Sequence, residues 1–280
     1  MIKESSSLRK LRRVLNKVLL LLVVALYAIP LYIAVVNAFK DYSEIIMSPL
    51  ALPTSFNLDN FIETWKKVNV PQLYLNSFVI TASSLVLLIL TSSMVAYVVA
   101  RSESKYIVFL QMFFMFGMMV PVQMILIPSI KTMQFFKLFQ TTIGMVLFNT
   151  AVYFSTSFLL YSEFFKTLPK ELEESARIDG ASKFVIYRKI LFPILKPCTS
   201  SVMIFSGMWI WNDFLPPLYL LDPKRGNTIT TGIYRAVGQY ATDWNTVFAA
   251  VIFSALPIVV LFLCLRKQFQ SGLAAGAVKG

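Results

Sequence analysis

Histidine is absent from this 280-residue chain, and cysteine occurs only twice. The missing imidazole removes the side chain most often used as a general acid or base and the commonest metal ligand. Cys198 and Cys264 do not form a C-x-x-C pair, so neither a disulfide framework nor a thiolate metal site is expected. We therefore expect no metal, no catalytic residues and no enzymatic activity.

A phosphate-binding loop is also missing. The sequence contains no G-x-x-x-x-G-K-[ST] motif, whose backbone amides would cradle the phosphates of a nucleotide. We expect no cofactor in this chain. If ATP takes part in its function, the nucleotide is bound by a partner polypeptide.

Charge is scarce as well. Only 14% of the residues are charged and 57% are hydrophobic, whereas about a quarter are charged in ordinary soluble domains. A helix of about 20 mostly apolar residues crosses a bilayer with every backbone group satisfied. Six stretches meet this description: 18–39, 74–100, 106–130, 138–162, 197–221 and 246–265. The sequence predicts an all-α polytopic membrane protein with six transmembrane helices.

The net charge of +12 is explained by where the basic residues lie. Of the 26 Lys and Arg residues, 18 lie in the amino-terminal tail, loops 101–105 and 163–196, and the carboxyl tail. By the positive-inside rule, both termini and loop 163–196 are expected in the cytoplasm, in a multi-pass protein of the cytoplasmic membrane. No basic patch remains for nucleic acid. The expected division is a tail 1–17, a transmembrane domain 18–265 and a tail 266–280.

Loop 163–196 carries an unusual charged stretch, "ELEESARIDGASKFVIYRKILFPILKP", at residues 171–197. Acids in the first turn favour a short helix, and Gly180 stands where a left-handed residue would end it. Ser182 can cap a second helix that runs toward Pro193. The pattern predicts a helix-turn-helix whose first helix presents small residues, such as Ser175 and Ala176, to a partner protein. An ordinary solvated loop is the alternative interpretation.

The same stretch resembles the EAA motif of ATP-binding-cassette import permeases, which reads E-A-A, three residues, G, nine residues, I-x-L-P. The matching positions are Glu174, Ser175, Ala176, Gly180, Ile190 and Pro193. Ser175 and Phe192 depart from the usual alanine and leucine. Asp179, directly before the glycine, is typical of the carbohydrate-uptake branch, and the stretches "WIWNDFLPPLYLL" (209–221) and "SGLAAGAVKG" (271–280) are similar to that branch too.

This resemblance implies a type I importer fold and a role as one of two permease subunits. Two cytoplasmic ATPase subunits would bind ATP, and an extracytoplasmic binding protein would deliver a carbohydrate, with an oligosaccharide preferred. The helix around Glu174 would lie in a cleft of an ATPase subunit, and Gly180 would set the angle that transmits movement. Gly276 and Lys279 in the tail would also contact the ATPases.

Candidate residues for the substrate route are Asn212, Asp213 and Asn149. An acid within a membrane span is costly and usually faces a cavity or a partner, but Asp213 can equally satisfy backbone groups where proline breaks the helix. Asn149 belongs to a polar cluster with Thr150 and Ser155, for which interhelical hydrogen bonds are an equally good explanation.

Other functions are weighed against the sugar permease. A coupling loop says little about cargo, so a non-sugar solute such as a phosphorylated polyol stays open. An ion-coupled secondary transporter would place several ionisable groups near the bilayer midplane. A membrane-embedded enzyme would need catalytic groups. The predicted spans contain only one acid, Asp213, which argues against both of these classes.

Overall fold

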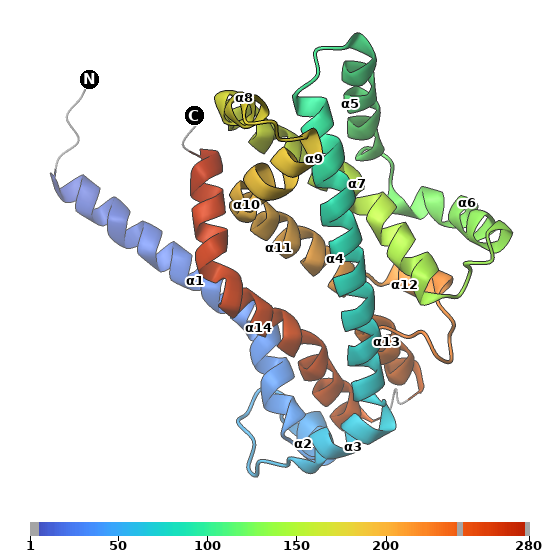
Figure 1. Ribbon diagram of the computed structural model, residues 1–280. Coiled ribbons are helices and arrows are strands. Elements are labelled where there is room, and N and C mark those ends of the chain that lie inside the picture. The colour runs from blue at the N-terminus through green and yellow to red at the C-terminus, as the bar shows by residue number, and fades with distance from the viewer. Residues whose placement is uncertain (1–5, 240–242, 278–280) are drawn as a thin grey trace. The chain divides into compact units, whose positions relative to one another are not determined.

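The structure is a computed structural model that describes residues 6–239 and 243–277. Within these ranges every regular element is a helix, so the predicted all-α class is confirmed (Figure 1). The chain forms two compact units, one from residues 1–69 and 233–255 and the other from 70–232 and 256–280.

The first unit contains the long apolar helix α1, two short helices after it, and parts of the last two helices of the chain. Its elements are α1 (Ser6–Ala38), α2 (Tyr42–Met47), α3 (Asp59–Lys67), the end of α13 (Ile229–Gln239) and the start of α14 (Trp244–Ala277). Aromatic rings form part of its core: Phe61 packs on Phe39 with centroids 5.0 Å apart and on Phe253 at 5.8 Å. None of the membrane-length apolar window of α1 is buried within the chain, which suits a helix surrounded by lipid or by another subunit.

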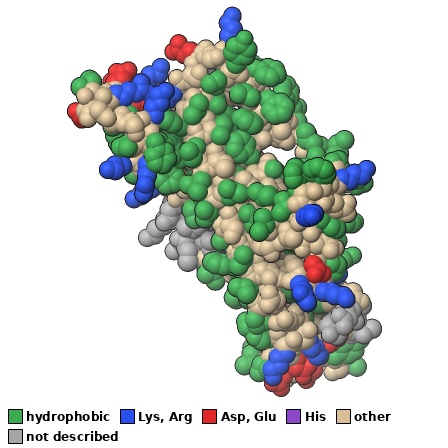
Figure 2. Space-filling view, turned by 45° about the vertical axis from the view of Figure 1, so that its right-hand side comes forward, with side chains coloured by type: hydrophobic (Ala, Val, Ile, Leu, Met, Phe, Trp, Pro, Cys, Tyr) green, Lys and Arg blue, Asp and Glu red, His purple; other side chains and the backbone are tan. Residues whose placement is uncertain are grey.

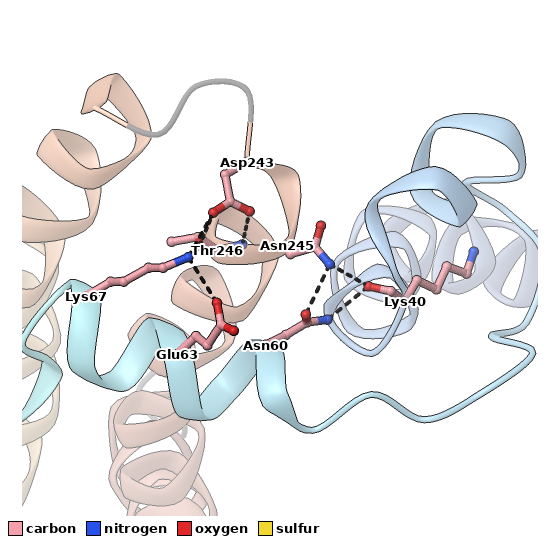
Figure 3. A network of polar contacts seen from close by, with 7 residues as sticks. All are labelled: Lys40, Asn60, Glu63, Lys67, Asp243, Asn245 and Thr246. Atoms are coloured by element: carbon pink, nitrogen blue, oxygen red, sulfur yellow. Dashed lines mark hydrogen bonds and ion pairs between the residues drawn. The ribbon is translucent and has the colours of Figure 1, made fainter.

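A polar network joins the parts of the first unit (Figure 3). The ammonium of Lys67 lies 3.0 Å from Oε2 of Glu63 and 3.3 Å from Oδ2 of Asp243. Nearby, the side-chain amide of Asn245 donates to the backbone oxygen of Lys40 at 2.9 Å and to Oδ1 of Asn60 at 3.0 Å. These bonds fasten the start of α14 to α3 and to the segment after α1.

The ion pair between Lys67 and Asp243 changes the pKa of both residues. The hydrogen bond with Glu63, more than any other contact, raises the pKa of Lys67. Burial acts to raise the pKa of Asp243, but hydrogen bonds from Thr246 and the ammonium of Lys67 outweigh it and hold that pKa below its ordinary value. Each group is therefore stabilised in its charged form.

The second unit is organised around two helices that run side by side, α4 (Val70–Ala100) and α7 (Thr142–Thr167) (Figure 1). Small residues such as Ser84, Ser92 and Ala96 are fully buried on α4 and let the neighbouring backbone approach closely. Helix α11 (Lys196–Asn212) packs against both. The fully buried apolar side chains of this core include Leu88, Phe158, Tyr161, Phe165, Leu195 and Val202.

Two predicted spans are broken. The break in 106–130 contradicts the expectation of one uninterrupted helix, whereas a break in 197–221 is one of the outcomes expected at Asp213. In place of one helix over 106–130, α5 (Lys105–Gly117) and α6 (Val122–Phe135) meet at a bend of 105°. Pro121 lies at the break, where it lacks an amide hydrogen and disfavours helical geometry in Val120. The stretch 197–221 is likewise divided into α11 and α12 (Leu215–Leu220), because Asp213 leaves helical geometry with a ψ of 135°.

The described residues contain three single helices long and apolar enough to span a membrane. The number rises to five if two bent pairs each count as one span, namely Lys105–Gly117 with Val122–Phe135 and Lys183–Ile194 with Lys196–Asn212. The three are Arg12–Ala38, Val70–Ala100 and Thr142–Thr167. The sixth expected span, 246–265, lies within α14, which is not among the spans counted here. The number of six therefore stays a prediction. Helix α1 begins at Ser6 and α14 reaches Ala277, so both expected tails are partly helical.

The surface agrees with a membrane setting. Hydrophobic side chains cover much of the face in view in Figure 2. Helix α5 has no buried residue, and its Phe109, Phe113 and Phe116 are all exposed. Such apolar surface is stable in lipid and would be a liability in water.

Candidate functional site

The charged loop folds as its local sequence predicts. Glu171, Glu173 and Glu174 lie in the first turn of α8 (Glu171–Ile178). Gly180 then adopts a φ of +83°, and the amide of Ala181 donates to the backbone oxygen of Ala176 at 2.9 Å. This left-handed residue closes the helix end, a conformation that glycine adopts without steric cost. The predicted first helix and the turn are confirmed.

The second helix of the loop is less regular than expected. The Ser182 hydroxyl accepts a hydrogen bond from the Val185 amide at the start of α9 (Lys183–Ile186), as predicted. The chain then widens into the π-helix η1 (Tyr187–Leu191) before α10 (Phe192–Ile194). A single α-helix toward Pro193 is therefore wrong. Proline has no amide to donate to the carbonyl four residues earlier, and a π-turn shifts the hydrogen-bond register at that point.

Glu173 is the residue of the loop that sequence reasoning missed. The residue is only 3% exposed. Its carboxylate accepts hydrogen bonds from the Tyr97 hydroxyl at 2.9 Å and from Nε of Arg101 at 2.6 Å. Arg101 also donates to the backbone oxygen of Leu168 at 3.1 Å. A charge-assisted pair thus ties α8 to the end of α4. The only hint in the sequence was that Arg101 is the first charged residue after a long apolar span.

Burial divides the residues of the motif into two sets. Glu174, Ser175 and Asp179 are exposed, and Ile178, on the same short helix, is 87% exposed. Ala176 is only 8% exposed and packs in the core of its own unit. The expectation that Ala176 faces a partner is therefore wrong, because this position closes α8 onto the membrane unit. Ile190 is half-buried and Pro193 exposed in the second helix.

Asp213 lies where α11 ends. Its Oδ2 accepts a hydrogen bond from the Tyr153 hydroxyl of α7 at 2.9 Å, and its backbone oxygen accepts one from the Thr230 hydroxyl at 2.7 Å. The Tyr153 ring is stacked on Trp209 with centroids 5.8 Å apart. The amino end of α12 has no side-chain cap. The carboxylate therefore bonds across helices instead of capping the broken one.

A cavity of about 400 Å³ opens beside this carboxylate. It is lined by Val122, Gln123, Leu126, Asp213, Phe214, Leu215 and Pro216. The break between α5 and α6 and the break after α11 thus supply its walls, so both irregularities of the fold border one space. We call it the Asp213 cavity.

The other candidate residues for the route lie elsewhere. Asn212 donates to the Met208 backbone oxygen at 2.9 Å within its own helix. Asn149 is fully buried, and its amide donates to the Ser84 hydroxyl of α4 at 3.4 Å. Neither lines the Asp213 cavity. A larger hollow of about 720 Å³ between α4, α5 and α7 is lined by Thr150, Ser155 and mainly apolar side chains.

The remaining expectations concern the tail and metal binding. Gly276 lies in α14, while Lys279 falls outside the described residues. Among residues 6–239 and 243–277, no three or more Cys, Asp or Glu side chains gather in a way that could hold a metal ion. The buried Cys198 has a free thiol.

Residues 90–274 match the family model described as binding-protein-dependent transport system inner membrane component. The chain is 35% identical over 92% of its length, and 94% of the relative's, to the melibiose/raffinose/stachyose import permease protein MelC of Bacillus subtilis. It is 33% identical to the probable starch degradation products transport system permease protein AmyC of Thermoanaerobacterium thermosulfurigenes, over 91% of this chain and 92% of that one.

Two solved structures resemble the fold. One is a bacterial ABC transporter involved in the import of the acidic polysaccharide alginate, with a TM-score of 0.82, 18% identity, and coverage of 95% of this chain and 99% of that one. The second is a bacterial alginate ABC transporter in complex with a pentasaccharide-bound periplasmic protein, with a TM-score of 0.69, 18% identity, and coverage of 90% and 92%. At this identity the likeness concerns the fold.

Proposed function

Because the chain belongs to the family of binding-protein-dependent transport system inner membrane components, we propose that it forms one half of the translocation pathway of an oligosaccharide importer. Family and relatives make it a multi-pass carbohydrate-uptake permease of the inner membrane. The family and its named relatives are permeases, not enzymes. The relatives carry oligosaccharides by name, which supports the same substrate class here.

The observation that carries the coupling role is the exposed face of α8. This short helix is held to α4 by the buried Glu173 and Arg101 pair, yet it leaves Ser175 and the 87% exposed Ile178 open to a partner. A rigidly anchored helix with an exposed apolar tip suits a mechanical contact, because force on the tip is passed to the span that holds its base. We propose that this face docks on a cytoplasmic ATPase subunit.

The assembly we propose has five parts besides the sugar. A second permease completes the pathway, two ATPase subunits bind the ATP, and an extracytoplasmic binding protein delivers the substrate. The complex of a structural neighbour with its periplasmic protein supports the last of these. Six spans with both termini in the cytoplasm would place α8 and the ATPases on the same side of the membrane.

Reconstitution into liposomes tests this function. The chain is reconstituted together with its partner permease, ATPase subunits and binding protein. This complex should take up a neutral oligosaccharide, such as raffinose or maltotriose, only when ATP is present on the side of the membrane that carries the ATPase subunits. The chain alone should give no ATP-dependent uptake. Uptake of sugar by the single chain would contradict the proposal.

Crosslinking tests the docking face directly. Single cysteines at Ser175 or Ile178 should crosslink to a cysteine on the ATPase, with a yield that changes between nucleotide-free and ATP-bound states. A cysteine at the buried Ala176 is the matched control on the same helix and should react much less. Equal yields at all three positions, or none in any nucleotide state, would count against docking by this face.

A further inference from the structure

We propose that the Asp213 cavity is a binding subsite for one uncharged, hydroxyl-rich sugar unit, with Asp213 as hydroxyl acceptor and Gln123 as a second polar contact. The inference rests on the proposed function and names the kind of sugar that this chain itself contacts. Asp213 and Gln123 both line the cavity, and they come from different helices, one from the end of α11 and one from the first turn of α6.

The carboxylate of Asp213 is incompletely satisfied. An ionised carboxylate offers about four lone-pair sites, and the Tyr153 hydroxyl occupies one of them on Oδ2. No Lys or Arg among the described residues pairs with it. A half-buried carboxylate without a cation is unfavourable unless hydrogen-bond donors reach it, and adjacent hydroxyls of a sugar are such donors.

The walls suit the other face of a sugar. The apolar lining residues are Val122, Leu126, Phe214, Leu215 and Pro216. Small-molecule sites are mostly apolar with a few placed polar groups, and they measure about 300–1,000 Å³. At about 400 Å³ the cavity is near the lower end of that range, which suits a short part of an oligosaccharide. The apolar walls can contact the C–H faces of its rings.

The orientation of the carboxylate is fixed by its neighbours. Tyr153 donates to Oδ2 from α7, and its ring is held against Trp209 in a stacked pair. Thr230 holds the Asp213 backbone oxygen at 2.7 Å. A ligand therefore meets a preorganised acceptor and does not have to order it, which favours binding.

Charge decides which sugars fit. A carboxylate that no protein cation neutralises repels the carboxylate of a uronic acid or a phosphate, and the repulsion is stronger in a space with little water. Hydroxyl groups of a neutral sugar meet no such penalty. The cavity therefore selects an uncharged unit over an anionic one.

The test uses the complete reconstituted transporter and two probes, the neutral oligosaccharide that the wild type transports best and an oligosaccharide of uronic acids. Asp213→Asn should raise the KM for the neutral sugar about tenfold, the effect of losing a hydrogen bond to a charged group. It should also narrow the preference over the uronic-acid probe. Gln123→Leu should raise the neutral-sugar KM with a smaller change in kcat. Glu163→Gln, on an exposed carboxylate of α7, is the control and should change neither.

The outcomes separate this inference from the proposed function. A wild-type complex without any sugar uptake overturns both. ATP-driven uptake of neutral sugar that is unaffected by Asp213→Asn and Gln123→Leu, or a wild-type preference for the uronic-acid probe, overturns the subsite alone. If Asp213→Asn fails to assemble, Gln123→Leu decides, because the Gln123 side chain is exposed and its loss leaves no buried group unpaired.

Discussion

Two carboxylates of the second unit each accept a hydrogen bond from a tyrosine, but only one of them is also paired with a cation. Glu173 and Asp213 each accept a hydrogen bond of 2.9 Å from a tyrosine hydroxyl, Tyr97 in one case and Tyr153 in the other. Glu173 also receives the guanidinium of Arg101, whereas no Lys or Arg in the described part of the chain pairs with Asp213.

This difference distinguishes a carboxylate that holds two helices together from one that can bind a ligand. At Glu173 each oxygen has a protein donor and the residue is 3% exposed, so no room is left for a ligand. At Asp213 the carboxylate borders a cavity and keeps unused acceptor capacity. A buried charge that is paired holds two elements together, while one that is unpaired is relieved by whatever donor can enter.

The largest effect is expected when Glu173 is removed. Glu173→Ala leaves Arg101 without its carboxylate, and its side chain is only 14% exposed. Removing one partner of a buried pair costs about 3–5 kcal/mol, so we expect a large fall in the thermal unfolding temperature of the detergent-solubilised protein. Transport should be lost with it.

The matched control replaces both partners at once. Glu173→Leu combined with Arg101→Met removes the two charges together, and this should recover most of the lost stability. If the single and double variants unfold at the same temperature, the pair is not what holds α8 to α4.

The next effect concerns the backbone of the coupling loop. A Cβ atom on Gly180 would meet nothing within 4 Å, so the space is free, but the φ of +83° is strained for other residues. Gly180→Val should cost about 1–3 kcal/mol, and the loop should relax by turning α8 away from its partner. We expect a membrane-inserted protein that loses its ATPase subunits on purification or hydrolyses ATP without moving sugar.

Two substitutions separate conformation from bulk. Gly180→Asn should be milder, because asparagine tolerates the left-handed region better than other side chains. Ala181→Val adds bulk at the next residue without requiring a positive φ and should also be milder. Normal transport by Gly180→Val would show that the left-handed turn is dispensable.

Neutralising Asp213 should have a much smaller effect on stability than removing Glu173. In Asp213→Asn the amide oxygen can still accept from Tyr153, and no cation is left without a partner. We expect a change in unfolding free energy of no more than about 1 kcal/mol, measured by chemical denaturation in detergent. A loss as large as that of Glu173→Ala would mean that Asp213 is structural and would remove the contrast between the two sites.

The smallest effect belongs to a third carboxylate, Asp243 in the first unit, whose partner Lys67 is 38% exposed (Figure 3). Exposed ion pairs contribute about 0.2–1 kcal/mol, so Asp243→Asn should lower stability slightly, and less at high salt.

The pH dependence of this pair has a defined direction. Because the pKa of Asp243 is lowered, its contribution is present above the unfolded pKa of about 3.9 and is lost as pH falls through the folded value. The raised pKa of Lys67 gives the opposite limit: its contribution is present below about pH 10.4 and is lost as pH rises through the folded value. In unfolding scans across pH, the stability difference between the wild type and the double variant Lys67→Met, Asp243→Asn should shrink at both limits.

The sequence by itself determined the features that depend on neighbours along the chain. Apolar length predicted helices at α1, α4 and α7, since a span must satisfy its own backbone groups. The acids of α8, the left-handed Gly180 and the Ser182 cap were predictable for the same reason, because each acts within four residues of its position. The family resemblance rested on these local features.

Only the tertiary structure decided which distant groups meet. Arg101 and Glu173 are 72 positions apart, and Tyr153 and Asp213 are 60 apart, so no periodicity or spacing links them. The direction of Ala176 and the cavity beside Asp213 likewise depend on which helices pack together. Hydrophobic pattern records that a residue prefers burial, but pairing among buried polar groups is set by the packing of side chains from separate helices.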